Sequence, residues 1–251
     1  MSPHTLDWTI LWPACVAGLL ITATHVPLGA QVLNRGIVFI DLAIAQIAGF
    51  GVVFADWLGL EPQGWAVQAC ALAAALAGAA LLTWTDKRWP DVQEATIGVT
   101  FVLAASAALL LLSANPHGGE HLKELLVGQI LWVSPARLPI VAAVYAALLA
   151  WMFLRRGSHG RVGFYLMFAI AVTISVQLVG LYLVFTTLIV PALATRRLVR
   201  YRLAAGFAVS AAGYFLGLVV SAYTDLPTGP AIVCTMVAVA IPVFALSPRR
   251  A

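Results

Sequence analysis

The chain has 251 residues, of which 62% are hydrophobic and only 10% carry a charge. Soluble domains carry roughly a quarter charged residues, so this composition excludes an ordinary soluble domain. The apolar residues form runs of about 17 to 22, each long enough to cross a hydrocarbon core roughly 30 Å thick. The runs lack the alternation that a transmembrane barrel strand requires. The sequence therefore predicts an all-α, polytopic bundle of about eight or nine transmembrane helices.

The cysteines and the charge exclude two further classes of protein. Cys15, Cys70 and Cys234 lie inside apolar runs and form no Cys-x-x-Cys pair, so we interpret them as small hydrophobic residues. The net charge of +4 comes from basic residues between the runs, where they set membrane orientation rather than bind nucleic acid. The first residues, MSPHTLD, lack the basic region of a cleaved signal peptide. We expect one transmembrane domain over residues 1–251.

Hydropathy predicts the spans in chain order. They are 8–28, 37–56, 65–84, 94–113, 138–154, 163–195, 203–223 and 229–247. The sixth segment is too long for one crossing, because about 20 residues suffice. Arginines flank it on both sides, and both groups lie in the cytoplasm only if the segment crosses twice. We therefore expect two short helices there, broken near Gly180 or Pro191.

This choice sets the orientation of the whole chain. It predicts nine crossings with the N-terminus outside, and it places every basic residue except Lys123 and Arg137 in the cytoplasm. The amphipathic segment 120–136 is too short to span comfortably, so we interpret it as an interfacial or re-entrant helix. The spacing of Gly213 and Gly217 predicts that two helices approach each other closely.

Asp41 is an acidic residue inside the apolar run 37–56. A charge there costs at least a few kcal/mol unless it is paired, hydrated or protonated, which makes the residue a functional candidate. The alternative is a structural role near the cytoplasmic end, about 9 Å along the helix from Arg35. Gln46 follows in the same run, five residues later.

A second candidate site is the segment NPHGGEHL. His117, Glu120 and His121 combine two imidazoles with a carboxylate, which are donors suited to zinc, manganese or iron. The letters also match the H-x-x-E-H pattern of a zinc peptidase, but the two intervening glycines fit a loop rather than the helix that such a site needs. Three interpretations stay open: an external loop that gathers ions, an ordinary solvated loop, and a peptidase site.

The basic segment ATRRLVRYR follows Pro191 on the predicted cytoplasmic side. Arg196, Arg197 and Arg200 exceed what orientation needs, and they suit a cytoplasmic partner or anionic lipid headgroups. Orientation alone is the alternative. No GxxxxGK[ST] loop occurs in the chain, so we do not expect it to hold ATP by itself. We interpret His25, in the first span, as a structural or surface histidine.

Four segments together resemble one known family. They are VLNRGIVFIDLAIAQIAGFG (32–51), ELLVGQILWVS (124–134), LYLVFTTLIVPALAT (181–195) and DLPTGPAIV (225–233). In this order they look like the membrane permeases of the ABC-3 family of metal-type ABC importers, which carry zinc, manganese or iron. The resemblance implies that Asp41 lies on the metal path. Many members have a histidine four residues later, where this chain has Ala45 and then Gln46. An amide oxygen in place of an imidazole nitrogen favours harder ions over zinc.

The resemblance also implies the partners. A second copy of the chain would complete the translocation path, and a separate cytoplasmic ABC ATPase would bind ATP and dock near Arg196, Arg197 and Arg200. An extracytoplasmic metal-binding protein would deliver the ion. We expect no permanently bound cofactor beyond the transported divalent metal ion, no enzymatic activity in this chain, and a place among the lipids of a bacterial cytoplasmic (inner) membrane.

Two other functions compete with this one. An ion-coupled secondary transporter would need no ATPase, but it is expected to carry acidic or broken-helix sites in both halves, and no carboxylate in the second half corresponds to Asp41. An intramembrane metallopeptidase would use His117, Glu120 and His121 and would need no ATP.

Overall fold

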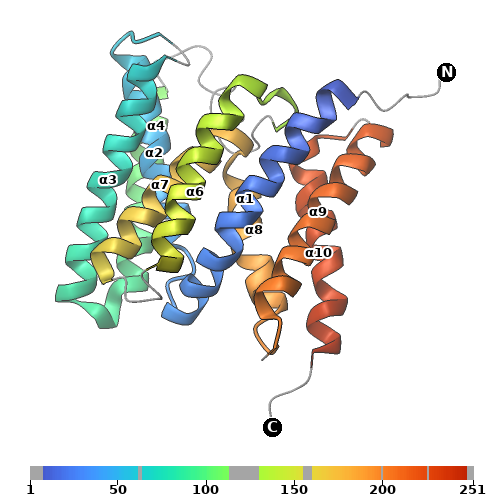
Figure 1. Cartoon of the computed structure of the whole chain (residues 1–251). Helices are drawn as coiled ribbons and strands as arrows, with labels where there is room; N and C mark the ends of the chain where they lie inside the picture. Colours follow the sequence, from blue (N-terminus) through green and yellow to red (C-terminus); the bar gives the residue numbers. More distant parts are fainter. Residues whose placement is uncertain are drawn as a thin grey trace. The chain divides into compact units, whose positions relative to one another are not determined.

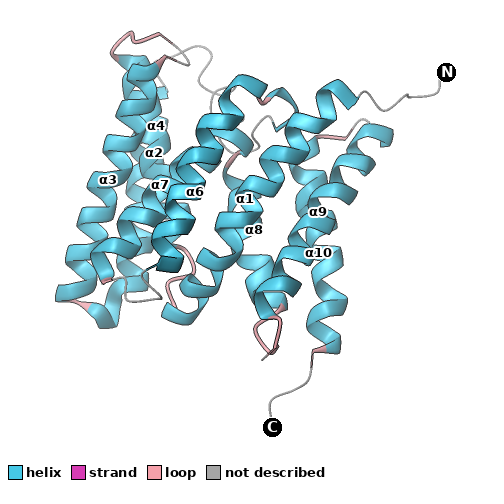
Figure 2. Cartoon of the chain, viewed as in Figure 1, coloured by secondary structure: helices cyan, strands magenta, loops and turns pink. Residues whose placement is uncertain are grey.

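The computed structural model describes residues 8–61, 64–112, 130–154, 160–198, 200–224 and 226–247. Within these ranges the chain forms helices, turns and loops but no strand, as Figure 2 shows. Eight of the helices in the described ranges are long and apolar enough to cross a membrane. The predicted all-α transmembrane class is therefore confirmed.

Most helices begin and end within a few residues of the predicted spans. They are α1 Trp8–Arg35, α2 Ile40–Trp57, α3 Trp65–Arg88, α4 Gln93–Leu112, α6 Leu138–Leu154, α7 Arg161–Val179, α8 Leu181–Ala194, α9 Arg202–Thr224 and α10 Thr228–Leu246. The largest difference is in α1, which continues beyond the predicted end at residue 28 and contains Pro27 inside it. Gln31 and Asn34 lower the hydropathy of this end without breaking the helix, so α1 extends beyond its apolar part.

The long segment 163–195 forms two helices, as predicted. α7 ends at Val179 and α8 begins at Leu181, and Gly180 between them has a φ of +83°. A side chain would be strained in that conformation, whereas glycine adopts it freely. Pro191 lies inside α8 and does not break it. With 14 residues, α8 rises about 21 Å, less than the hydrocarbon thickness, so the number of nine crossings remains a prediction.

The predicted interfacial helix at 120–136 lies mostly outside the described residues. Its last part forms two short 3-10 turns, Ile130–Trp132 and Pro135–Arg137, which lead into α6. A further 3-10 turn, Pro90–Val92, joins α3 to α4.

The helices divide into two compact units, and each unit is assembled from segments distant in the sequence. Unit 1 consists of residues 1–34, 126–149 and 178–251, and it contains α1, most of α6, α8, α9 and α10. Unit 2 consists of residues 35–125 and 150–177, and it contains α2, α3, α4 and most of α7. In the colours of Figure 1, unit 1 thus joins blue α1 with red α10. Neither unit can form before distant parts of the chain meet.

In unit 1, α1 and α9 pack as antiparallel helices with one constant register. Three pairs, spaced four residues apart on each helix, face one another. They are Gly18 with Tyr214, Thr22 with Ser210, and Val26 with Gly206. The middle pair is a hydrogen bond of 2.8 Å between the two hydroxyl groups. A glycine in each flanking pair leaves the space that the larger partner fills.

A stretch of α9 further along the helix, on nearly the same face, packs against α10 in the same manner. Here too the pairs step by four residues along each helix. They are Gly213 with Met236, Gly217 with Ile232, and Ser221 with Thr228. The hydroxyl of Thr235 on α10 also donates to the backbone carbonyl of Gly213, at 2.8 Å. The close approach predicted from the spacing of Gly213 and Gly217 is therefore confirmed.

In unit 2, α2 packs against both α3 and α4. On the α3 side, Gly51 lies against Ala74, and Gly78 lies against Ile47. On the α4 side, Val53 packs with Ala108 and Leu112 near the ends of both helices. The first turns of α2 and α4 also lie close together, so these two helices run parallel.

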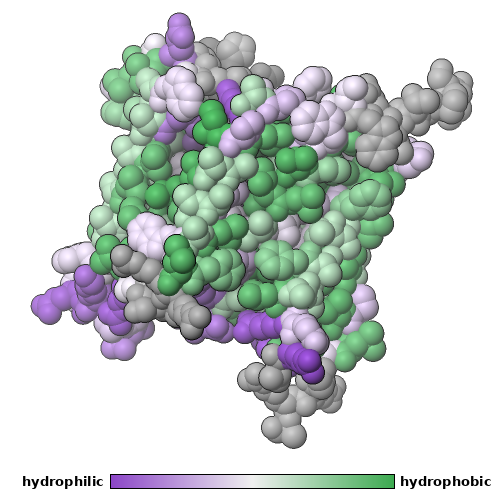
Figure 3. Space-filling view, viewed as in Figure 1, coloured by the Kyte–Doolittle hydropathy of each residue, from purple (hydrophilic) through white to green (hydrophobic). Residues whose placement is uncertain are grey.

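The described surface is apolar along the helices. In Figure 3, hydrophobic residues (green) cover their middle parts, and hydrophilic residues (purple) gather where helices end. Several large apolar side chains on these helices are exposed, including Leu103, Leu110 and Ile241. This surface suits lipid.

The substitution Gly29→Ala tests the packing of unit 1. A Cβ at Gly29 of α1 would collide with the backbone carbonyl oxygen of Leu188 on α8, which cannot rotate away. We expect a loss of about 1–3 kcal/mol of stability, as overpacking usually causes. Thermal unfolding of the purified chain in detergent measures it.

Gly98→Ala is the matched control, because a Cβ at Gly98, also inside a helix, meets nothing within 4 Å. We expect it to leave the unfolding temperature unchanged or to raise it. Equal unfolding temperatures for the two variants would contradict the close contact between α1 and α8.

Candidate functional site

Asp41 lies in the first turn of α2, and its side chain is fully buried. Neither carboxylate oxygen has a hydrogen-bond partner among the described residues. The carboxylate faces the backbone amides of Asp41 and Leu42, and the start of a helix favours negative charge. Arg35, the partner in the structural alternative, instead places its guanidinium carbon 4.3 Å from the ring centre of Phe164. Asp41 is thus a buried acid without an ionic partner in the described part of the chain.

Gln46 does not share a helical face with Asp41. Five residues on an α-helix turn through about 500°, which places the two side chains roughly 140° apart around α2. Gln46 is half-buried. Ala45 is the residue that lies on nearly the same face as Asp41, and its buried side chain offers no ligand. Gln46 therefore remains a predicted metal-path residue that α2 alone does not bring to Asp41.

Glu94 is a second acidic residue beside Asp41, and the sequence analysis missed it. It lies in the first turn of α4, and its Oε2 atom is buried with no hydrogen-bond partner in the described ranges. Its carboxylate interacts with the backbone amide of Phe39, the residue before α2, and it acts electrostatically on Asp41. Glu94 is the first residue of the predicted span 94–113, whereas Asp41 lies inside its apolar run. The position of Glu94 at the edge of a span was visible in the sequence, but the adjacency of α2 and α4 was not.

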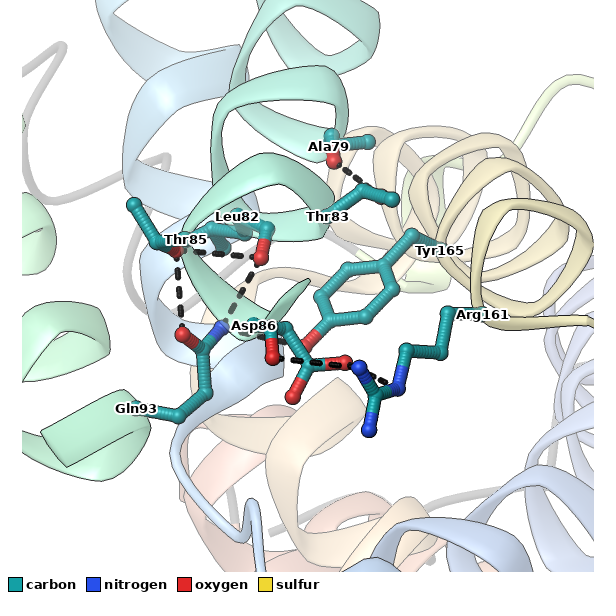
Figure 4. Close-up of polar contacts among 8 residues, drawn as sticks. All are labelled: Ala79, Leu82, Thr83, Thr85, Asp86, Gln93, Arg161 and Tyr165. Carbon is teal, nitrogen blue, oxygen red and sulfur yellow. Dashed lines mark hydrogen bonds and ion pairs between the residues drawn. The ribbon is translucent and has the colours of Figure 1, made fainter. Parts of the chain in front are cut away.

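Gln93, one residue before Glu94, joins three helices (Figure 4). Its Nε2 atom donates to the backbone carbonyl of Leu82 on α3, at 3.0 Å, and to the hydroxyl of Tyr165 on α7, at 3.1 Å. Its Oε1 atom accepts a hydrogen bond of 3.0 Å from the hydroxyl of Thr85. All of its polar atoms are thus engaged, and the start of α4 is held between α3 and α7.

An ion pair closes the same end of unit 2. Nε of Arg161 on α7 lies 3.2 Å from Oδ2 of Asp86 on α3, and Nη1 donates to the Asp86 carbonyl at 3.3 Å (Figure 4). The Arg161 side chain is 49% exposed, so this pair contributes little stability. Arg161 is therefore paired with Asp86 and not with Asp41 or Glu94.

The basic segment after α8 is a turn with its arginines stacked on aromatic rings. The guanidinium carbons of Arg196 and Arg197 lie 5.3 Å and 4.5 Å from the ring centre of Phe244 on α10. That of Arg200 lies 4.9 Å from the ring centre of Tyr201. Tyr201 has a φ of +60°, which is rare for a residue with a bulky side chain. The turn therefore presents three arginines in defined positions next to a strained residue.

His25 is buried rather than exposed. Its Nδ1 atom lies 3.1 Å from the backbone carbonyl of Ile21 and 3.0 Å from the hydroxyl of Thr24. Its Nε2 atom is buried without a hydrogen-bond partner in the described residues. Of the two interpretations offered from sequence, the structure rules out a surface histidine.

The predicted loop site with His117, Glu120 and His121 lies outside the described residues, in 113–129. Among the residues that the structure describes, no group of three or more His, Cys, Asp and Glu side chains is placed to hold a metal ion.

The substitution Gln93→Leu tests the junction of α3, α4 and α7. It removes all three hydrogen bonds of the Gln93 amide and leaves the Tyr165 hydroxyl short of a partner, whereas the Leu82 carbonyl keeps its bond from the Thr85 hydroxyl. We expect a loss of about 1–3 kcal/mol. Tyr165→Phe removes only one of the three bonds, so we expect a loss below about 1 kcal/mol. Thermal unfolding ranks the variants, and a larger effect of Tyr165→Phe would contradict the central role of Gln93.

Comparison with known proteins identifies the family of the chain. Two solved structures share the fold. One is PsaBC from Streptococcus pneumoniae in complex with Fab, at a TM-score of 0.75 and 22% identity, covering 96% of this chain and 93% of that one. The other is an ABC transporter assigned to the metal-chelate type, in an inward-facing conformation, at a TM-score of 0.72 and 14% identity, covering 98% and 92%. Residues 7–159 and 158–247 match the sequence profile of the ABC 3 transport family. The chain therefore belongs to the ABC 3 transport family and is a multi-pass membrane permease.

Proposed function

We propose that this chain is the permease subunit of an ATP-driven importer of a divalent metal ion, and that two copies enclose the path. The observation that carries the proposal is Asp41, a fully buried acid whose oxygens have no hydrogen-bond partner in the described structure. An ionisable residue in a membrane span is costly and marks an ion path more often than a structural contact. One solved relative in fold is itself assigned to the metal-chelate type of ABC transporter, which supports a metal as the cargo.

A transport path needs sites that bind weakly, because the ion must leave as readily as it enters. Asp41 fits this need, since a single carboxylate offers one or two oxygen ligands and leaves the other positions to water. Two-fold symmetry in a dimer would double the donors. Family membership argues against the two competing functions, because a secondary carrier and a peptidase both work without an ATPase.

The ATPase partner is proposed to dock on the turn that contains Arg196, Arg197 and Arg200. Stacking on Phe244 and Tyr201 holds the guanidinium groups in place, which lowers the entropy lost when a partner binds. The positive-inside rule assigns this turn to the cytoplasm, where ATP is available. An extracytoplasmic metal-binding protein delivers the ion on the opposite side of a bacterial cytoplasmic membrane.

The first functional test is uptake of zinc, manganese and iron into proteoliposomes that hold this chain with its ATPase. We expect Asp41→Asn to abolish ATP-dependent uptake, because the amide keeps the shape of the side chain and removes its charge. The variant should still elute as a folded protein of wild-type size.

Asp56→Asn is the matched control, because Asp56 lies near the other end of the same helix. It should transport like the wild type. Near-normal uptake by Asp41→Asn would remove Asp41 from the path, and uptake without ATP would contradict the importer.

The docking surface makes a separate prediction. Replacing Arg196, Arg197 and Arg200 together with alanine should prevent the ATPase from co-purifying with the permease, because the turn loses its positive charge. Arg137→Ala removes an exposed arginine before α6 and serves as the control. Undiminished co-purification of the triple variant would place the ATPase elsewhere.

A further inference from the structure

Unit 2 contains two acidic residues, Asp41 and Glu94, with buried oxygens that lack a hydrogen-bond partner among the described residues. Both oxygens of Asp41 and Oε2 of Glu94 are buried without hydrogen-bond partners in the described part of the chain. Arg161 forms an ion pair with Asp86. Arg35, which precedes α2, stacks on Phe164. Arg161 and Arg35 thus have partners other than Asp41 and Glu94.

The packing of α2 and α4 brings the two acids together. Val53 of α2 packs with Ala108 of α4 at the far ends of the parallel helices. Counting back along both helices, Asp41 is twelve residues before Val53 and Glu94 is fourteen residues before Ala108. The two acids thus lie at nearly the same height, about three to four turns below that contact. The interaction of Glu94 with the Phe39 amide agrees with this register.

Neighbouring contacts fix the position of Glu94. Gln93, the preceding residue, is held by Leu82, Thr85 and Tyr165 (Figure 4), so the first turn of α4 cannot rotate without breaking hydrogen bonds. The backbone that carries Glu94 is therefore fixed beside α2. Placing two like charges there is unfavourable unless a proton or a cation lies between them.

We propose that Asp41 and Glu94 together bind a hard divalent cation of the manganese(II) type at this end of unit 2. This inference rests on the proposed function and adds Glu94 as a second ligand from another helix. Carboxylate oxygens suit manganese, whereas softer ions gain more from imidazole or thiolate. Ala45 offers no nitrogen donor on the face of Asp41, so oxygen atoms and water complete the coordination. The two helix starts add their partial positive charge and keep the anionic pair from being prohibitively costly.

The test is equilibrium binding of Mn²⁺ to the complex of the full chain with its ATPase in lipid nanodiscs, without ATP. The electron paramagnetic resonance signal of free Mn²⁺ reports the bound fraction. We expect Glu94→Gln to weaken binding by about tenfold or more, and Glu94→Asp, which keeps the charge, to recover part of the affinity. Glu61→Gln, at an exposed loop residue after α2, should bind like the wild type.

Three outcomes separate the site from the transport function. Equal Mn²⁺ affinity for Glu94→Gln and the wild type would overturn the inference, because the acids would then share a proton instead. Absent Mn²⁺ binding with intact ATP-dependent metal uptake would also overturn it and leave the proposed function standing. Glu94-dependent binding without uptake of any metal would support the site and contradict the importer.

A second measurement, on the wild-type complex, tests the site even if Glu94→Gln fails to fold. The carboxylate stretching bands of the wild-type complex, recorded by infrared difference spectroscopy, should shift when Mn²⁺ is added. Unchanged bands at saturating Mn²⁺ would overturn the site without any variant.

Discussion

The hydrocarbon around this chain offers no hydrogen bonds, so every buried polar group must find a partner inside the protein. Most of the described hydroxyl groups meet this demand locally by donating to the carbonyl four residues earlier, as Thr83, Ser175 and Thr187 do. Gln93 meets it by joining three helices. Against this background, the unpartnered oxygens of Asp41 and Glu94 are exceptions among the described residues, as are His25 Nε2, Thr173 Oγ1 and Arg202 Nε. Under the proposed function, the acidic oxygens are the ones that accept a cation.

Hydropathy was sufficient to predict the helices because each one must supply a long apolar stretch of its own. The break between α7 and α8 was also accessible, since flanking arginines required two crossings and Gly180 offered a residue that tolerates positive φ. The end of α1 was not, because a helix continues beyond its apolar part when its polar residues still favour helical structure. The division into two interleaved units could not be predicted either. They depend on which helices meet, and hydropathy does not encode that choice.

The candidate site, too, could be predicted from the sequence only in part. Asp41 was identified because a single acid in an apolar run is conspicuous by itself. Glu94 was not, because it stands at the edge of its run, where an acid is ordinary, and only the parallel packing of α2 and α4 gives it a partner. Gln46 was chosen for its closeness to Asp41 in sequence, whereas helical geometry turns it away. Residue types and spacing thus indicated one half of the pair, and packing supplied the other.

The packing of α9 has a mechanical consequence. α1 and α10 contact successive stretches of nearly the same face of α9, where glycines and larger side chains interlock turn by turn. Sliding by less than a full turn would drive Tyr214 or Met236 into a backbone, so α1, α9 and α10 behave as one stiff plate. A push on the arginine turn that leads into α9 is then transmitted along the whole plate at once, instead of being absorbed by the bending of a single helix.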